Sequence, residues 1–396
     1  MTSDGGNPFR IHGVVEGEYF TDRAEEIVRV LRCFREPGSK LLVYGPRRMG
    51  KTSALTQGIA RHEAEGGVGF LADLSTATTL VDVANRLLEA AGVALGRRWK
   101  DAIHDFVARL GLSLTLRPDP ATGTVVPSLD LRLRGEAIEQ QRTSFAQALD
   151  ALDALAGGRG ATLGVVLDEF QEIRRFGGDT AEWHLRGILQ HHRHVSYVLA
   201  GSQQHIIERM VDQGAAFYGL ADHLAFGPID PAHLSRWIDD RLGRAGVKAD
   251  GVGSRIVEAL GPRTRDIVQV ARQLHANCAA TGRATTEEVT RALDDVVAEQ
   301  QALLESLWRD LTALQQNVLR AVAADLDGLT TAASLRRFGL ASSGSTANAA
   351  GALVGAGRLL RAPTRTGYAF DSPFLRRWVE LTTLSDVGAG PRDPPS

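Results

Sequence analysis

An eight-residue segment near the N-terminus has the composition and spacing of a phosphate-binding loop. It matches the pattern GxxxxGK[ST] without departure. Its glycines let the backbone curl, so that successive N–H groups and the N-terminus of the following helix face phosphate oxygens. Lys51 would neutralise the β- and γ-phosphates, and the Thr52 hydroxyl would bind Mg²⁺. The residues predicted to bind nucleotide here are Gly45, Pro46, Arg47, Arg48, Met49, Gly50, Lys51, Thr52 and Ser53.

The surroundings of this loop support the same interpretation. An apolar run at 41–44 precedes it, and a helical pattern at 52–65 follows it. A phosphate loop needs this strand–loop–helix order. A chance match to the pattern in a chain with 42 glycines would not need to lie between a strand and a helix. No N/T-K-x-D run for reading guanine is present, so the sequence favours ATP over GTP.

A second polar site follows another apolar run. Residues 163–167 lead directly into Asp168 and Glu169, as a Walker B strand should. Asp168 would hold Mg²⁺ through water, and Glu169 would act as the general base that polarises the attacking water. The alternative is that two adjacent acids merely end a strand.

Ser202 and Gln203 follow the apolar run at 195–200. A strand there would lie beside the Walker B strand and direct a polar side chain at the γ-phosphate, with Ser202 the better candidate and Gln203 the second. The alternative role for Ser202 is the N-cap of the next helix.

Five apolar runs without polar alternation predict a parallel sheet buried on both faces. Helical patterns separate most of them, which is typical of an α/β domain. The first helix is expected to be capped by Asp22 or Thr21. Alternating leucines within 111–134 predict a β-ribbon, and the insert at 93–134 has no function that we can assign. The runs lie at 41–44, 68–74, 163–167, 195–200 and 224–229.

Composition limits the class of protein. A chain of 396 residues predicts two or three domains. The net charge of −2 excludes a uniformly basic nucleic-acid binder, and two cysteines are too few for a disulfide or zinc framework. No apolar run approaches the roughly 18 residues of a membrane helix. The N-terminus lacks a signal-peptide pattern, so we expect a cytoplasmic protein with no membrane partner.

The domain organisation follows from where these patterns change. Residues 1–230 carry the strand–helix alternation, and 231–305 show helical patterns only. Residues 306–384 combine three short helical patterns with a hairpin-like segment at 359–370. The tail at 385–396 has no apolar period and is expected to be disordered.

Several of these motifs together resemble the archaeal-type ATPases, AAA+/STAND-like proteins related to the origin-recognition ATPase fold. The resemblance covers about residues 7 to 384. It implies a P-loop NTPase domain with a five-stranded parallel sheet, an all-helical lid and a C-terminal winged-helix domain. The matching segments are 7–9 (NPF), 19–27 (YFTDRAEEI), 45–52 (GPRRMGKT), 167–171 (LDEFQ), 200–202 (AGS) and 367–378 (GYAFDSPFLRRW).

The same resemblance implies further nucleotide contacts. Pro8, Phe9 and Val14 would lie against the adenine base. Arg263 would be the lid arginine that contacts nucleotide, with Arg265 as an alternative; otherwise both are solvated arginines at a helix break.

One departure concerns the arginine that related ATPases supply to a neighbouring subunit. No arginine occurs between Arg209 and Arg236. Such an arginine is worth about 10³–10⁵ in rate elsewhere. Slow turnover or a nucleotide-state switch therefore fits the sequence better than hydrolysis activated by a neighbour in a ring.

The C-terminal module is locally basic. Residues 306–384 contain nine arginines and five acids, a difference of +4. Arg358, Arg361 and Arg365 fall on or beside the expected wing and could neutralise DNA phosphates. The expected recognition helix at 345–356 is rich in Ala and Gly and offers only Ser345, Thr346 and Asn348 to base edges. The module could instead pack on the ATPase core or bind a protein.

The sequence therefore predicts a Mg²⁺-dependent ATPase that binds ATP and ADP, with Lys51, Glu169 and Ser202 as catalytic residues and Thr52 and Asp168 as metal ligands. Nucleotide state would reposition the lid and the winged helix. Two alternatives remain: an ATP-regulated protein that binds double-stranded DNA, and a slow-turnover switch that signals to a protein partner or assembles with itself.

Overall fold

The computed structural model describes residues 6–11, 17–98, 114–118, 125–129, 138–159, 162–326 and 328–384. The predicted adenine contact Val14 and the predicted disordered tail lie outside these residues. The chain divides into two compact units, one of residues 12–229 and the other of residues 1–11 together with 230–396. Each unit is described separately.

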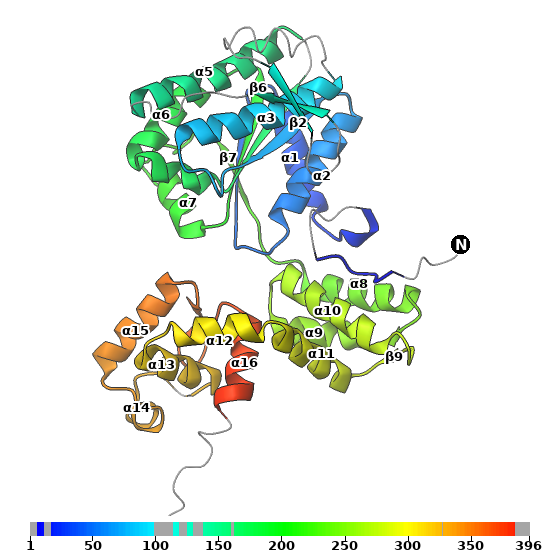
Figure 1. Ribbon diagram of the computed structural model, residues 1–396, viewed down its shortest axis with the longest axis vertical. Helices are drawn as coiled ribbons and strands as arrows, with labels where there is room; N and C mark the ends of the chain where they lie inside the picture. The colour runs from blue at the N-terminus through cyan, green and yellow to red at the C-terminus, as the bar shows by residue number, and fades with distance from the viewer. Residues whose placement is uncertain are drawn as a thin grey trace, which may run out of the picture. The chain divides into compact units, whose positions relative to one another are not determined.

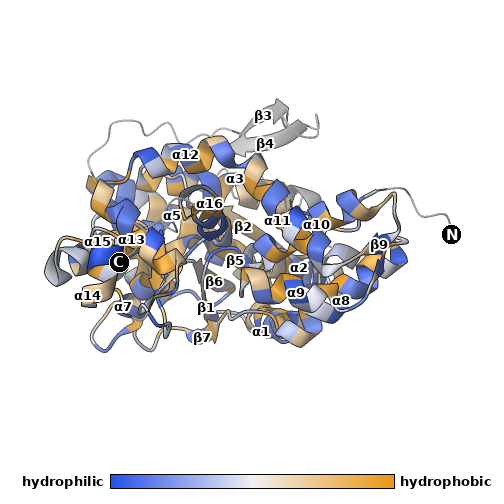
Figure 2. Cartoon of the chain, turned by 90° about the horizontal axis from the view of Figure 1, so that it is seen from below, coloured by the Kyte–Doolittle hydropathy of each residue, from blue (hydrophilic) through white to orange (hydrophobic). Residues whose placement is uncertain are grey.

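A five-stranded sheet, entirely parallel, forms the centre of the 12–229 unit, as expected. Its order is β2-β5-β6-β1-β7, which can be followed in Figure 2. The three central strands are almost completely buried because helices cover both faces. The edge strand β7 begins two residues earlier than predicted and ends at Ala225. The strands are β1 (Lys40–Tyr44), β2 (Val68–Asp73), β5 (Leu163–Asp168), β6 (Val195–Gly201) and β7 (Asp222–Ala225).

Helices cover both faces of this sheet, and each face has its own apolar core (Figure 1). α1 (Ala24–Arg35) and α2 (Lys51–Ala64) cover one face. The other face carries α3 (Leu80–Arg98), α5 (Ile138–Gly157), α6 (Asp179–Leu189) and α7 (Gln204–Val211). Short 3-10 helices η1 (Gly17–Tyr19) and η2 (Phe170–Phe176) complete the unit.

An antiparallel ribbon lies where the alternating leucines predict one. β3 (Leu114–Pro118) pairs with β4 (Val125–Leu129), with Leu114 opposite Leu129. The preceding helix α3 continues to Arg98, so the first residues of the 93–134 segment are helical rather than part of the ribbon.

In the other unit, helices fill the segment predicted as a lid. These are α8 (Pro231–Arg244), α9 (Val252–Leu260), α10 (Thr264–Cys278) and α11 (Thr286–Glu299). Two short strands that the sequence did not predict, β8 (Lys248–Ala249) and β9 (Arg283–Ala284), pair in parallel between them.

In the described residues of the segment predicted as a winged helix, three helices are followed by a two-stranded hairpin and a further helix. The helix α12 (Gln301–Arg309) spans the boundary expected at 305/306. An ion pair between Arg377 and Asp294, with N–O distances of 2.7 and 3.1 Å, joins α16 to α11. The elements are α13 (Ala313–Ala323), α14 (Ala332–Arg337), α15 (Ser343–Gly355), β10 (Leu359–Arg361), β11 (Tyr368–Phe370) and α16 (Pro373–Thr383).

Among the described residues, no helix is both long enough and apolar enough to span a membrane.

Candidate nucleotide site

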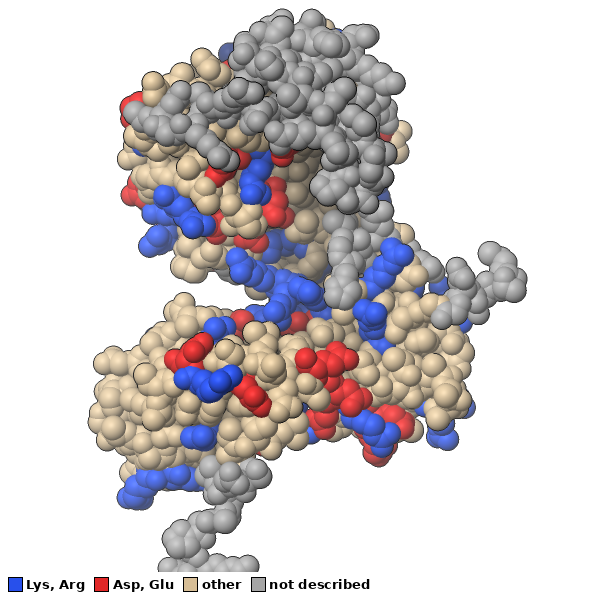
Figure 3. Space-filling view, in the orientation of Figure 1, with Lys and Arg blue, Asp and Glu red and all other residues tan. Residues whose placement is uncertain are grey.

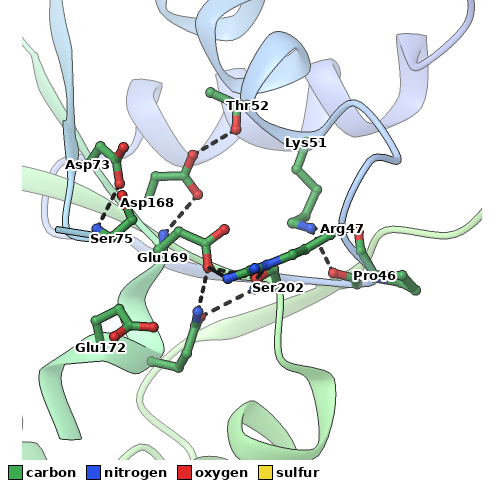
Figure 4. A network of polar contacts seen from close by, with 12 residues as sticks. Pro46, Arg47, Lys51, Thr52, Asp73, Ser75, Asp168, Glu169, Glu172 and Ser202 are labelled. Carbon is green, nitrogen blue, oxygen red and sulfur yellow. Dashed lines mark hydrogen bonds and ion pairs between the residues drawn. The ribbon is translucent and has the colours of Figure 1, made fainter. Parts of the chain in front are cut away.

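The predicted site residues of the 12–229 unit meet at one edge of the sheet. The strands β5, β6 and β1 are neighbours and run in parallel, so their carboxyl ends lie side by side. The phosphate loop follows β1, Asp168 ends β5 with Glu169 directly after it, and Ser202 follows β6 (Figure 4). This is the crevice at which open parallel sheets bind their ligands.

The Lys51 ammonium lies inside the phosphate loop and is buried. Its Nζ donates to the carbonyl oxygens of Gly45 at 2.7 Å and Pro46 at 2.8 Å. Burial lowers the pKa of Lys51 from its ordinary 10.5 to about 8, against the opposing effect of nearby Glu169 and Asp168. A cation with so little water around it interacts strongly with a phosphate that replaces the carbonyl contacts.

Only glycine fits at the start of the loop. A Cβ at position 45 would lie 2.2 Å from the carbonyl oxygen of Phe226. Gly50, with φ of 87°, takes the left-handed conformation that turns the loop into α2. The side chain of Met49 packs into the core between α1, α2 and the sheet, so this residue offers a nucleotide only its backbone.

Arg23 holds the loop from behind, a role that the sequence did not reveal. Its guanidinium, only 3% exposed, donates to the carbonyl oxygens of Met49 at 3.0 Å and Gly227 at 2.8 Å. It also pairs with Glu26 at 2.8 Å and stacks over the Phe226 ring at 4.2 Å. Charged donors make strong hydrogen bonds in buried surroundings, so Arg23 fixes the loop backbone against the segment that leaves β7.

The predicted caps of the first helix are wrong. The N-cap of α1 is Arg23, and it makes no side-chain cap bond. Asp22 and Arg23 both have positive φ, 60° and 71°, which turns the chain sharply before the helix. In the sequence, Arg23 belongs only to the family-like segment 19–27, and spacing along the chain does not predict its contacts with positions 49 and 227.

The two predicted Mg²⁺ ligands are in contact. The Thr52 hydroxyl donates to Asp168 Oδ2 at 2.7 Å, and the backbone N–H of Glu169 donates to Oδ1 at 2.9 Å. Burial raises the pKa of Asp168, these two hydrogen bonds lower it, and the carboxylates of Glu169 and Asp73 raise it further. A buried carboxylate beside other carboxylates and a hydroxyl is an all-oxygen donor set, which fits Mg²⁺.

Glu169 accepts several donors on a single carboxylate oxygen. Ser202 Oγ donates to Oε2 at 2.6 Å, and Gln171 Nε2 donates to the same atom at 2.5 Å. The guanidinium of Arg47 lies 3.8 Å from it, and the Nε of Arg47 donates to Ser202 Oγ at 3.1 Å. The predicted base and the predicted γ-phosphate contact are therefore direct partners (Figure 4).

Ser202 is not a helix cap, so the alternative role for this residue is wrong. The N-cap of α7 is Gln203, and it makes no side-chain cap bond. The Ser202 hydroxyl instead joins Glu169 to the phosphate loop.

The other candidate nucleotide residues belong to the second unit. Phe9 is 2% exposed and meets Trp237 edge to face with ring centroids 5.7 Å apart. The carbonyl oxygen of Pro8 accepts a hydrogen bond from Arg241 Nε at 2.6 Å. Arg263 forms an ion pair with Asp371 and is not a solvated arginine. The structure explains how these residues are held, and their contact with nucleotide stays a prediction.

The predicted DNA contacts lie on or beside the β10–β11 hairpin. Arg361 and Arg365 are exposed, and Arg358 is half-buried. Two of the base-reading candidates on α15 are unsuitable. Thr346 is completely buried, and the Ser345 hydroxyl is engaged in a capping box with Ser342. On the face drawn in Figure 3, both units expose basic and acidic side chains among the described residues.

Comparison with solved structures supports the fold. No curated protein sequence matches the chain. A Walker-type ATPase of Pyrococcus abyssi has a similar structure, with a TM-score of 0.62, 16% identity, and coverage of 94% of this chain and 99% of that one. The ADP form of the ORC2 protein of Aeropyrum pernix matches with a TM-score of 0.50, 15% identity, and coverage of 92% and 93%. These likenesses concern the fold.

The family assignment comes from a family model and covers the site itself. The model describes an ATPase domain found predominantly in Archaea, and it matches residues 20–242, more than half of the chain. The matched segment contains the phosphate loop, Asp168, Glu169 and Ser202. The chain is therefore a P-loop ATPase and belongs to this predominantly archaeal ATPase family.

Proposed function

We propose that the protein hydrolyses ATP to ADP and phosphate with Mg²⁺ bound by Thr52 and Asp168. The observation that carries the proposal is the contact between these two oxygens, 2.7 Å apart, beside Glu169 and Lys51. Mg²⁺ held there supplies positive charge to the phosphate oxygens.

In this site Glu169 accepts a proton from the attacking water. The water oxygen forms a bond to the γ-phosphorus as the bond from that phosphorus to the β–γ bridging oxygen breaks. Lys51 stabilises the charge of the β- and γ-phosphates, and the Ser202 hydroxyl exchanges its hydrogen bond to Glu169 for one to the γ-phosphate.

The metal assignment is tested by Thr52→Val. We expect the Mg²⁺ concentration that supports half-maximal hydrolysis to rise at least about tenfold. Mutation of a side chain that only supports a metal ligand already lowers metal affinity or activity about 10–100-fold. The measurement is steady-state hydrolysis across a Mg²⁺ titration, with EDTA abolishing turnover of the wild type.

Thr56→Val is the matched control, since Thr56 lies one turn later on α2 and donates to the carbonyl of Thr52 at 2.9 Å. It should leave the Mg²⁺ requirement within about twofold of the wild type. Equal Mg²⁺ requirements in Thr52→Val and Thr56→Val would remove Thr52 from the metal site.

We further propose that nucleotide state repositions the lid and the winged helix through Arg263. The ion pair of Arg263 with Asp371 joins the lid to β11 and α16, so a nucleotide that attracts Arg263 competes with Asp371. Asp371→Asn releases the arginine and is expected to tighten ATP binding several-fold, whereas Arg263→Met weakens it.

Calorimetric titration of ATP measures both effects. Asp294→Asn is the matched control, because it breaks a different ion pair of this unit, that with Arg377, and leaves Arg263 in place. If Asp371→Asn and Asp294→Asn shift the affinity equally, Arg263 has no special role in nucleotide binding.

Duplex DNA binding is a second candidate function, favoured by the exposure of Arg361 and Arg365 on the hairpin. Since α15 offers few groups to base edges, the binding would be to phosphates, salt-dependent and independent of sequence. Stimulation of hydrolysis by duplex DNA at low salt, fading at high salt, would support this function. Hydrolysis indifferent to DNA would favour the slow nucleotide switch with a protein partner.

A further inference from the structure

Gln171 is a buried polar side chain that the predicted catalytic set does not include. It lies two residues after Glu169 in η2 and is 2% exposed. Its neighbours Phe170 and Ile173 belong to the apolar core, which fixes the backbone of this turn. A buried amide is costly unless both of its ends are hydrogen-bonded, so its partners indicate its role.

Both ends of the Gln171 amide are used, and they join two parts of the site. Nε2 donates to Glu169 Oε2 at 2.5 Å, while Oε1 accepts from the backbone N–H of Ser202 at 3.2 Å. One side chain thus links the carboxylate at the end of β5 to the backbone at the end of β6. The link needs one donor and one acceptor, a combination that a carboxylate or an aliphatic side chain lacks.

The amide lies in a slot that only glycine leaves open. A Cβ at Gly201 would lie 2.8 Å from Gln171 Oε1 and 2.6 Å from the Cδ1 atom of Ile207. The close approach of the amide to β6 therefore depends on the missing side chain at position 201. The amide is confined, and its orientation is set by the sheet.

The backbone of Glu169 has an uncommon conformation, and an exposed arginine lies near its carboxylate. Glu169 has φ of 54°, a left-handed conformation that is uncommon for a residue with a side chain. The Arg47 side chain, 64% exposed, lies near the same carboxylate and could draw it toward the loop. A confined amide opposes that movement.

The three contacts converge on one oxygen of the carboxylate. Gln171, Ser202 and Arg47 all meet Oε2. Among the described residues, no hydrogen-bond donor contacts Oε1. Anchoring one oxygen leaves the other to accept a proton.

We propose that Gln171 is a positioning residue that anchors Glu169 through Oε2 and so presents Oε1 to the attacking water. The inference rests on the proposed role of Glu169 as general base. In this role Gln171 acts through Glu169 and not on the nucleotide, so its loss is expected to change the rate of hydrolysis and to leave nucleotide affinity unchanged.

Gln171→Met tests the proposal, because it keeps the length and removes both hydrogen bonds. We expect kcat to fall about 10–100-fold, as for a misplacement of about 1 Å, with the Kd for ATP within about twofold of the wild type. Gln171→Glu, which keeps the acceptor and loses the donor, should also lower kcat. Glu172→Gln, on the same turn and paired with Arg175, is the control and should leave kcat unchanged.

A double variant separates positioning from structure. If Gln171 acts through Glu169, Gln171→Met should not further lower the residual single-turnover rate of Glu169→Gln. In the nucleotide-free protein, urea unfolding is measured for Gln171→Met, for Glu169→Ala and for the variant that combines these two substitutions. The shift in urea midpoint of the combined variant should differ from the sum of the two single shifts, because the two side chains contact each other.

Three results would overturn the proposal: unchanged kcat in Gln171→Met, additive loss of rate in the double variant, or additive urea shifts. Full activity of Glu169→Gln is a different result, because it would refute the proposed role of Glu169. The two failures are therefore distinguishable in one set of proteins.

Discussion

Glu169→Gln is expected to lower kcat for ATP hydrolysis about a thousandfold and to leave the affinity for ATP within about threefold of the wild type. A positioned general base contributes about 10²–10⁴ in rate. The amide keeps an oxygen that accepts from Ser202, but it takes no proton from water. The lost contribution belongs to the chemical step, since Lys51 and the loop glycines that bind phosphate are unchanged.

The measurement is steady-state and single-turnover hydrolysis with Mg²⁺, with and without duplex DNA, alongside calorimetric titration of ATP. Glu172→Gln is the control for removing a nearby carboxylate and should keep wild-type turnover. Wild-type turnover no faster than that of Glu169→Gln, with or without DNA, would refute the catalytic role of Glu169. A nucleotide-bound switch awaiting a protein partner would then be the better description.

Arg23→Met is expected to destabilise the protein by about 3 kcal/mol and to weaken ATP binding at least about tenfold. A hydrogen bond to a charged group is worth about 1.5–3 kcal/mol, and here two buried carbonyls lose their donor. Methionine preserves the apolar contact with Phe226. Binding weakens because the Met49 carbonyl, part of the phosphate loop, loses its anchor at 3.0 Å.

Urea unfolding and ATP titration check both parts. The matched control is Arg29→Met on the same helix, because Arg29 also donates to a backbone carbonyl, that of His223 at 3.0 Å, but at the surface. Its loss should change stability by no more than about 0.5 kcal/mol. If Arg23→Met and Arg29→Met lose similar amounts of stability and ATP affinity, the buried contacts of Arg23 do not stabilise the phosphate loop.

Much of the nucleotide domain was predictable because its signals are local. A phosphate loop between a buried strand and a helix needs eight contiguous residues, and an acidic pair needs only the strand before it. The apolar runs that became β1, β2, β5 and β6 were recognisable because a strand buried on both faces has no polar alternation. The edge strand β7 begins two residues and ends four residues before its predicted bounds, because burial constrains an edge strand less.

Other features depended on contacts between residues far apart in the chain. Ser202 could be assigned either to the site or to a helix cap, and only the packing of β6 against β5 placed it on Glu169. Arg23 contacts chain positions 49 and 227, and no spacing rule connects these. The sequence makes Thr346 a candidate for contacts with base edges, but the packing of α15 buries its side chain completely.

The amino-acid sequence was sufficient to specify the reaction class, because GxxxxGK[ST] and the acidic strand end are chemical requirements met by neighbouring residues. It was also sufficient for the strand–helix alternation, which depends on local apolar pattern. The fold was needed for the partners of Glu169, for the anchor behind the loop and for the ion pair that occupies Arg263. Each of these is set where separate elements pack together, and hydrogen-bond geometry at such places depends on how the elements are arranged in three dimensions.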